Sequence, residues 1–245
     1  GGASPKPLVI WIHGGAFMFG NKGDRSRAWK LLEQDYAVAS LDYRKTDTAR
    51  FPEPVEDCKA AVRWLRANAR EYGIDPNRFG AVGESAGGYL VAMLGTTEDV
   101  TDFDRGPNEG VSSAVQCVAD FYGPTDFTLM NRQGEKIPGH MDHDGPDSPE
   151  SKLLGGPVQE NKEKAAKANP VTYVSPSDPP FLIVHGDLDP LVPYGQSEIL
   201  EAALKKAGVP VSLHTVKGGG HGTGFGKAEQ EAMEGFFKTH LKPGS

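Results

Sequence analysis

Short apolar runs alternate with longer amphipathic stretches along the 245-residue chain. This alternation is typical of an α/β protein, in which a mostly parallel, twisted sheet carries helices on both faces. No apolar stretch approaches the ~18 residues that a membrane-spanning helix needs. The runs rich in Val, Ile and Leu predict strands over residues 8–12, 37–41, 78–82, 114–120, 181–185 and 211–216.

The clearest helical pattern covers residues 54–72. Val55, Cys58 and Val62 recur at steps of three and four, which places them on one face of a helix. Pro54 is compatible with the first turn, and Gly73 supplies a C-terminal stop. Further helices are predicted over residues 89–94, 194–206 and 226–240.

Two stretches, 96–112 and 124–170, do not follow the alternation. Connections of this length inside a compact domain are usually functional excursions. We therefore expect residues 1–245 to form a single domain in which 124–170, a segment with several prolines, is a cap or insertion over the site.

Charge and cysteine content narrow the function classes. A net charge of -7 and a pI near 5.5 argue against binding to nucleic acid or to an anionic membrane. Cys58 and Cys117 fall on predicted apolar faces, so we interpret both as small buried side chains rather than as a disulfide. The first residues contain no apolar signal core, which fits a cytoplasmic protein, a processed secreted or periplasmic one, or a trimmed chain.

Residues 83–87 read Gly-Glu-Ser-Ala-Gly and lie between a predicted strand and a predicted helix. In this order, glycines two before and two after a serine allow a sharp turn that exposes the hydroxyl. Ser85 is therefore the candidate nucleophile. A string this short is a weak signal in a chain with 31 glycines, so its context must supply the remaining groups.

A serine hydroxyl needs a base, and the base needs a carboxylate to orient it. Two predicted strands end in loops that carry these groups: Asp187 and Asp189 follow one strand, and His221 follows the next. The carboxyl ends of parallel strands meet at one edge of a sheet, and Ser, Asp, His is the hydrolase order. We prefer Asp189 as the acid over Asp187, and Asp126 is a weaker third candidate that fits an Asx turn better.

Acyl transfer also requires hydrogen-bond donors for the oxyanion. The first predicted strand runs into small residues whose backbone N–H groups can face a cavity, with Gly15 and Ala16 as the expected donors. Ala86, directly after the serine, supplies another. We expect His13 to hold this loop through a side-chain hydrogen bond rather than to act as a base.

The other histidines have simpler interpretations. His185 ends a buried strand and is expected to bond a local backbone group, and His214 alternates outward along a strand. His140 and His143 lie in a proline-rich loop without a defined ligand set, so no metal site is predicted.

Taken together, these motifs resemble those of α/β-hydrolases of the esterase/lipase group, which includes hormone-sensitive-lipase-like enzymes and bacterial feruloyl and acetyl esterases. The resemblance implies Asp189 as the acid and His221 as the base. Two departures stand out: Ala16 replaces the usual third glycine of the oxyanion loop, and only Gly1 to Pro7 precede a strand that such enzymes normally place after one or two others. The N-terminal strands of the fold are therefore expected to be missing. The resemblance rests on residues 13–16, 41–44, 83–87, 169–173, 179–181 and 192–193.

The expected function is that of a serine carboxylesterase that hydrolyses short-chain or aryl esters through an acyl-enzyme, without a metal or organic cofactor. Phe17, Phe19 and Tyr122 are expected to contact the substrate. The family resemblance suggests small ester substrates, including acyl groups on plant polysaccharide. An amidase or prolyl-oligopeptidase-type peptidase, and a non-catalytic ligand-binding protein of the same fold, are the alternatives.

Overall fold

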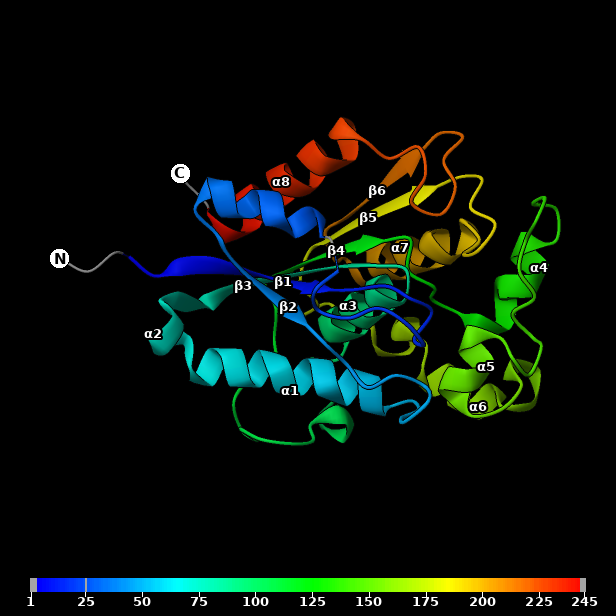
Figure 1. Cartoon of the computed structure of the whole chain (residues 1–245), viewed down its shortest axis with the longest axis horizontal. Helices are drawn as coiled ribbons and strands as arrows, with labels where there is room; N and C mark the ends of the chain where they lie inside the picture. The colour runs from blue at the N-terminus through cyan, green and yellow to red at the C-terminus, as the bar shows by residue number, and fades with distance from the viewer. Residues whose placement is uncertain (1–3, 25, 243–245) are drawn as a thin grey trace.

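A six-stranded, wholly parallel sheet in the order β2-β1-β3-β4-β5-β6 forms the centre of the structure (Figure 1). The computed structural model describes residues 4–24 and 26–242. Because the chain order reverses between β1 and β3, the loops after these two strands diverge and leave room for a site. The strands are β1 (Lys6–Ile12), β2 (Ala37–Leu41), β3 (Ile74–Glu84), β4 (Cys117–Phe121), β5 (Phe181–Gly186) and β6 (Val211–Val216).

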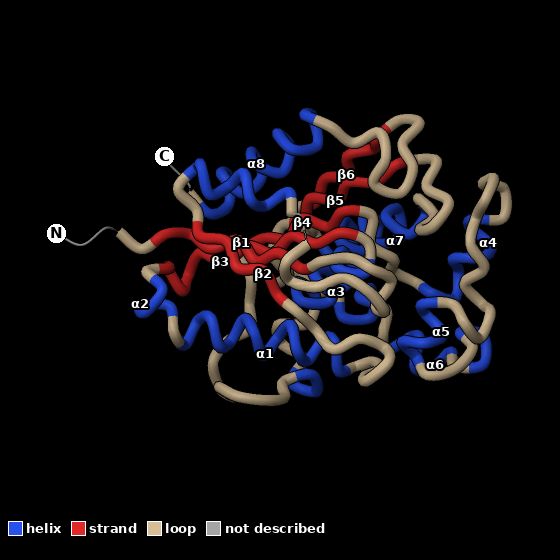
Figure 2. Tube along the Cα trace, in the orientation of Figure 1, coloured by secondary structure: helices blue, strands red, loops and turns tan. Residues whose placement is uncertain are grey.

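Helices cover both faces of this sheet (Figures 1 and 2). In β1, Leu8, Ile10 and Ile12 belong to one core cluster, while Val9 and Trp11 belong to the other. Both faces of the strand are thus buried, which is why its sequence is a continuous apolar run rather than an alternating one. Helices α1 (Glu53–Ala67), α3 (Ala86–Thr96) and α7 (Gly195–Ala207) pack on the first face, and the 3-10 helix η1 (Arg27–Gln34) and α8 (Lys227–Leu241) pack on the second.

All six predicted strands are present: β2 and β6 have the predicted ends, and the other four have shifted ends. β3 begins at Ile74 rather than at residue 78. The prediction missed this first part because residues 75–78, which follow Ile74, form no apolar run. β4 begins at Cys117, three residues later than predicted. The helix predicted over 54–72 is interrupted at Asn68, after which α2 (Ala69–Tyr72) forms a separate turn. Sequence reasoning missed η1 entirely.

The two irregular stretches have different positions. Residues 96–112, with η2 (Thr101–Phe103), are anchored on α1 by Lys59 and Arg63, which are buried and both pair with Asp104. Residues 124–170 carry the helices that group beyond the carboxyl ends of the strands in Figure 1. These are η3 (Phe127–Leu129), α4 (Met130–Gly134), α5 (Pro149–Leu154), η4 (Val158–Glu160) and α6 (Lys162–Lys167), followed by η5 (Pro170–Tyr173).

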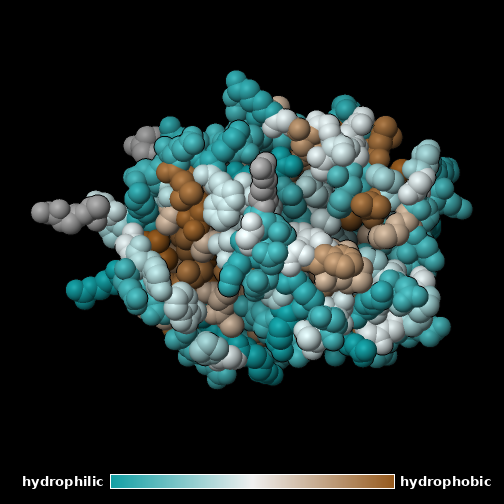
Figure 3. Space-filling model, in the orientation of Figure 1, coloured by the Kyte–Doolittle hydropathy of each residue, from teal (hydrophilic) through white to brown (hydrophobic). Residues whose placement is uncertain are grey.

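β2 is one edge of the sheet, and its outer side pairs with no other strand of the described residues. Four of its five residues are partly exposed, and Figure 3 shows apolar side chains at the surface where Figure 1 places this strand. Within 4–24 and 26–242, no helix is both long enough and apolar enough to cross a membrane.

Candidate active site

Ser85 occupies a sharp turn between β3 and α3, with φ 55° and ψ -121°. A non-glycine residue rarely adopts positive φ, so the surrounding packing must hold it there. A Cβ added to Gly83 would lie 2.2 Å from the Gly87 oxygen, and one added to Gly87 would lie 2.1 Å from the Ile12 oxygen. The two glycines are therefore required by close backbone approach, and the turn projects the hydroxyl beyond the end of the sheet.

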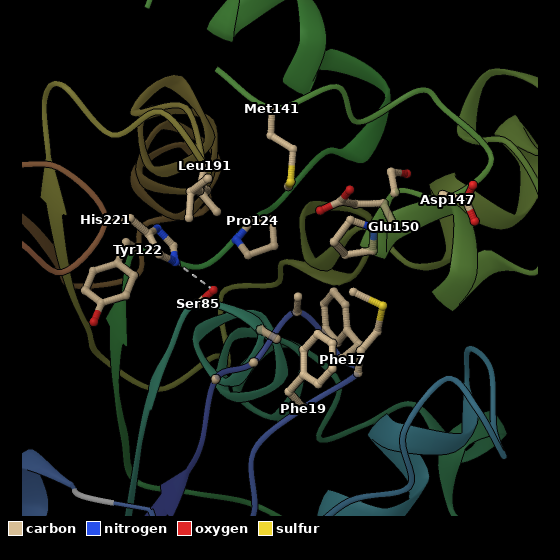
Figure 4. A pocket seen from close by; sticks show the side chains of 18 of the residues that line it. Phe17, Phe19, Ser85, Tyr122, Pro124, Met141, Asp147, Glu150, Leu191 and His221 are labelled. Atoms are coloured by element: carbon tan, nitrogen blue, oxygen red, sulfur yellow. Dashed lines mark hydrogen bonds between the residues drawn. The ribbon is translucent and has the colours of Figure 1, made fainter. Parts of the chain in front are cut away.

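The loops after β5 and β6 bring an aspartate and a histidine to this serine. His221 Nε2 lies 2.9 Å from Ser85 Oγ, and His221 Nδ1 lies 2.7 Å from Asp189 Oδ2 (Figure 4 shows the first contact). Because the carboxylate can only accept, Nδ1 carries the proton and Nε2 is free to accept from the hydroxyl. This is the arrangement in which an imidazole serves as a general base.

Asp189 is completely buried and receives four donors. Oδ1 accepts from the backbone N–H groups of Leu191 and Val192, and Oδ2 accepts from His221 and from His185 Nε2, at 3.2 Å. Burial opposes ionisation, but the hydrogen bonds from the two histidines and from the backbone outweigh it and hold the pKa of Asp189 well below its usual range. The acid therefore remains a carboxylate that can stabilise a protonated imidazole.

His185 differs from its sequence interpretation. Its Nε2 does bond a backbone group, the Val192 oxygen at 2.9 Å, but the same N–H also faces Asp189. Its Nδ1 accepts from the Ser197 hydroxyl at 2.6 Å. His185 thus orients the aspartate, a role that only the folded structure reveals.

The competing acids lie elsewhere. Asp187 accepts hydrogen bonds from the Gly218 N–H and from Lys217. Those bonds lower its pKa, the backbone one most. Asp126 caps η3 by accepting from Thr128 N, which agrees with the predicted Asx-type turn.

The loop after β1 presents backbone donors beside Ser85. Gly15, Ala16 and Phe17 all have positive φ, and the Gly15 oxygen accepts from the N–H groups of Met18 and Phe19. This tight turn leaves the N–H groups of Gly15 and Ala16, and that of Ala86, without an acceptor among the described residues. Ala16 tolerates the position of the usual glycine because its side chain is short.

His13 lies behind this loop, as predicted. The ring is buried, stacks on Tyr43 at a centroid distance of 4.5 Å, and places Nδ1 2.6 Å from the Gly14 oxygen. Its Nε2 lies 3.4 Å from Asp42 Oδ1. These contacts fix the loop and leave His13 no access to the serine.

A cavity of about 880 Å³ opens directly above Ser85 and His221 (Figure 4). The loop after β1 contributes Phe17 and Phe19, and the 124–170 stretch contributes Pro124, residues 141–142 and residues 145–150. Its volume and apolar lining are those of a small-molecule site. None of the residues in 96–112 lines it.

Tyr122 packs edge-on against the His221 ring at 4.8 Å and is almost fully buried. Burial, followed by the charge of Glu84, raises the pKa of its phenol far above the ordinary value. Glu84 pairs with Arg27, whose guanidinium also lies 4.9 Å from the Phe121 ring centroid. Arg27 was not singled out from the sequence, although the capping residue Ser26 and the buried pair Ala28 and Leu31 are signals of the short helix that carries it.

The remaining histidines that could bind a metal do not lie together. His214 pairs with Glu229, and His140 Nδ1 bonds the Met141 oxygen, so neither joins another histidine. Across the described ranges, no group of three or more His, Cys, Asp or Glu side chains is placed to hold a metal ion. Cys58 and Cys117 are free and buried, as predicted.

Asp120 on β4 is buried beneath the turn that carries Ser85. Its Oδ1 accepts from Gly123 N at 2.9 Å, while Oδ2 has no partner among the described residues. Burial raises the pKa of Asp120 to about 7. The folded chain therefore keeps a proton that the unfolded chain releases near pH 4, so this group lowers stability progressively as pH rises from about 4 to 7.

Asp120→Asn should remove that dependence. Relative to the unmodified protein, the variant is expected to gain on the order of 1–3 kcal/mol of unfolding free energy between pH 5 and pH 8, because it has no proton to lose. Urea unfolding at both pH values measures this difference. If the unfolding free energies of the two proteins differed by the same amount at pH 5 and pH 8, whatever the sign of that difference, the prediction would be wrong.

A parallel sheet with a nucleophile elbow after β3, an acid after β5 and a histidine after β6 defines an α/β-hydrolase of the esterase/lipase type. The chain belongs to the family described as BD-FAE, whose model matches residues 1–204.

Similar proteins agree with this assignment. Esterase LipQ of Mycobacterium tuberculosis is 31% identical over 206 residues, which are 82% of this chain and 46% of LipQ. The solved structure "Truncated form of carbohydrate esterase from gut microbiota" superposes with a TM-score of 0.90 at 31% identity, covering 98% of this chain and 87% of that one. An "acetyl ester-xyloside bifunctional hydrolase from Caldicellulosiruptor lactoaceticus" gives 0.81 at 27% identity, covering 98% and 85%. The chain spans about half the length of the curated relatives it matches.

Proposed function

We propose that this protein is a serine carboxylesterase that acts through Ser85, His221 and Asp189. The observation that supports the proposal most strongly is the continuous hydrogen-bonded series from the Ser85 hydroxyl through His221 to a buried aspartate. The esterase names of its relatives point the same way.

In the proposed mechanism, His221 Nε2 takes the hydroxyl proton as Ser85 Oγ attacks the ester carbonyl. The N–H groups of Gly15, Ala16 and Ala86 bind the resulting oxyanion. Asp189 stabilises the protonated imidazole, which then gives its proton to the leaving alcohol. Water attacks the acyl-enzyme with His221 as the base again, and the acid is released.

The proposed substrates are small esters, among them acyl groups carried on plant polysaccharide. Two similar solved structures are named as a carbohydrate esterase and an acetyl ester-xyloside hydrolase, and this supports acetylated carbohydrate as one class. Phe17 and Tyr122 line the cavity and supply apolar contact for the ester. We further propose that residues 124–170 act as a cap, since residues 141–142 and 145–150 line one side of the cavity.

Two experiments test the proposal. The first is labelling with a fluorophosphonate probe, and the second compares p-nitrophenyl esters of increasing acyl length with their matched anilides. We expect the probe to label Ser85, with ester turnover far exceeding anilide turnover, because p-nitrophenolate leaves without the protonation that an aniline nitrogen needs. Faster anilide cleavage would indicate an amidase or peptidase. Absence of both labelling and turnover would indicate a non-catalytic protein.

A further inference from the structure

A buried carboxylate in the cap wall faces the cavity. Glu150 is 3% exposed and lines the space above Ser85. In Figure 4 its carboxylate points into the cavity, on the side where Met141 and Pro124 lie. A charge in such an apolar wall costs free energy unless donors compensate it.

The structure provides a single donor. His143 Nδ1 lies 2.9 Å from Glu150 Oε2, and both side chains are nearly inaccessible to solvent. In the part of the chain that the structure describes, Oε1 has no hydrogen-bond partner and Glu150 pairs with no lysine or arginine. Oε2 is thus bonded to His143, and Oε1 is available to a group bound in the cavity.

The hydrogen-bond partners of His143 indicate which of its ring nitrogens carries a proton. Its Nε2 is buried without a partner, so a proton there would be a donor without an acceptor. The geometry favours a ring with its only proton on Nδ1, directed at Glu150. Such a neutral imidazole orients the carboxylate without cancelling its charge, and the Glu150 anion can accept a further donor.

The hydrogen bonds that cap α5 do not use the Glu150 carboxylate, although the residue lies in the first turn of that helix. α5 is capped by Ser148, whose hydroxyl accepts from Ser151 N, and Glu150 accepts from no backbone N–H. The loop is held by other bonds, from His143 N to Asn131 and from Ser148 to the His143 oxygen. The segment would therefore keep its shape with an uncharged side chain at 150.

The other acidic groups of the cavity differ from Glu150. Glu84 is paired with Arg27, and Asp142 accepts from Asn131 and from backbone N–H groups. The Asp147 side chain is 95% exposed and lies near Lys152. Within residues 4–24 and 26–242, no lysine or arginine lines the cavity, so none of these residues favours an anionic substrate group.

We propose that Glu150, positioned by His143, is a specificity-determining residue that accepts a hydrogen bond from a hydroxyl group of the ester substrate. This inference rests on the proposed esterase function and adds that the substrate is hydroxylated. A neutral hydroxyl suits the site because the surrounding wall is apolar. A sugar hydroxyl and a phenolic hydroxyl are the two sources that share this chemistry.

Two matched substrate pairs test the proposal. The first is methyl ferulate against methyl 3,4-dimethoxycinnamate, and the second is a monoacetylated methyl xyloside against its O-methylated counterpart. The readout is the ratio of kcat/KM for the hydroxyl ester to that for the methyl ether. This ratio does not depend on how much of a preparation is correctly folded.

We expect the unmodified protein to prefer the hydroxyl ester in one pair by about tenfold or more, since a hydrogen bond to a charged group has that strength. Glu150→Gln and Glu150→Ala should lower the preference to less than about threefold. Asp147→Asn, the matched control, should retain it. The pair that responds identifies the source of the hydroxyl.

A lack of preference in both pairs, or a preference that Glu150→Gln and Glu150→Ala retain, would overturn the inference. Preference for an ammonium-bearing ester over both hydroxyl esters would do the same. Failure of the proposed function is distinguishable, because the unmodified protein would then hydrolyse none of these esters, p-nitrophenyl acetate included.

Discussion

Ser85→Ala is expected to reduce kcat/KM for p-nitrophenyl acetate by at least about 10⁴-fold, because the variant has no oxygen to form the acyl-enzyme. The residual rate should come from the oxyanion donors and from binding alone. The backbone at 85 keeps its φ of 55°, and the side chain contributes one hydrogen bond, to His221. The unfolding free energy should therefore change by less than about 1 kcal/mol.

Steady-state kinetics and chemical denaturation on the same preparation measure both effects. Fluorophosphonate labelling should disappear with the activity. An alanine variant that kept more than about one hundredth of the activity would exclude Ser85 as the nucleophile, since removal of the attacking group leaves far less. A large loss of stability would instead assign the residue a structural role.

Asp189→Asn is expected to lower kcat by about 10⁴-fold while leaving the position of the residue unchanged. The asparagine oxygen can keep the bonds from Leu191 N and Val192 N, so its amide N–H₂ then faces His221. An amide donor there favours the imidazole tautomer with its proton on Nε2. That nitrogen can no longer accept from Ser85.

Asp187→Asn is the matched control. It removes a charge two residues away that bonds only Lys217 and the Gly218 N–H, so kcat should change by less than about threefold. Pre-steady-state acylation measures the chemical step directly. Equal losses in the two variants would show that loop charge, rather than contact with His221, accounts for the effect.

The depressed pKa of Asp189 also gives a pH dependence of stability. Its folded-state pKa lies below the unfolded value near 3.9, so its contribution is present above about pH 4 and is lost as pH falls below that value. The stability difference between the unmodified protein and Asp189→Asn should shrink on acidification. Unfolding curves at pH 6 and pH 3 measure it alongside the kinetics.

Elements with a strong local pattern were predicted from sequence. The apolar runs correspond to the observed strands because a strand buried on both faces must be apolar throughout. The Gly83 to Gly87 turn was visible because only glycine allows the close backbone approach seen there. Two errors came from weak local signals: polar residues follow Ile74 in β3, and Asn68 interrupts a continuous helical pattern. η1 was missed although Ser26 caps it and its buried residues, Ala28 and Leu31, follow a helical spacing.

The contacts of the site depend on how the loops fold, whether the two residues are near or far apart in the chain. His185 touches Asp189 because the chain turns back after β5, and Arg27 reaches Glu84 across 57 positions. No spacing rule reports such contacts. The same holds for His143 and Glu150, which looked like parts of an irregular, proline-rich loop.

The sequence by itself determined the parallel sheet, the serine turn and the loops that carry the aspartates and the histidine, because each depends on local patterning and on the rule that parallel strands end at one edge. Asp189 was already preferred over Asp187 from the sequence, and the tertiary structure adds the physical reason, since Asp189 is the carboxylate that is buried beside His221. The position of Glu150 in the cavity lining is visible only in the tertiary structure. The fold of the 124–170 segment places one oxygen of this carboxylate against His143.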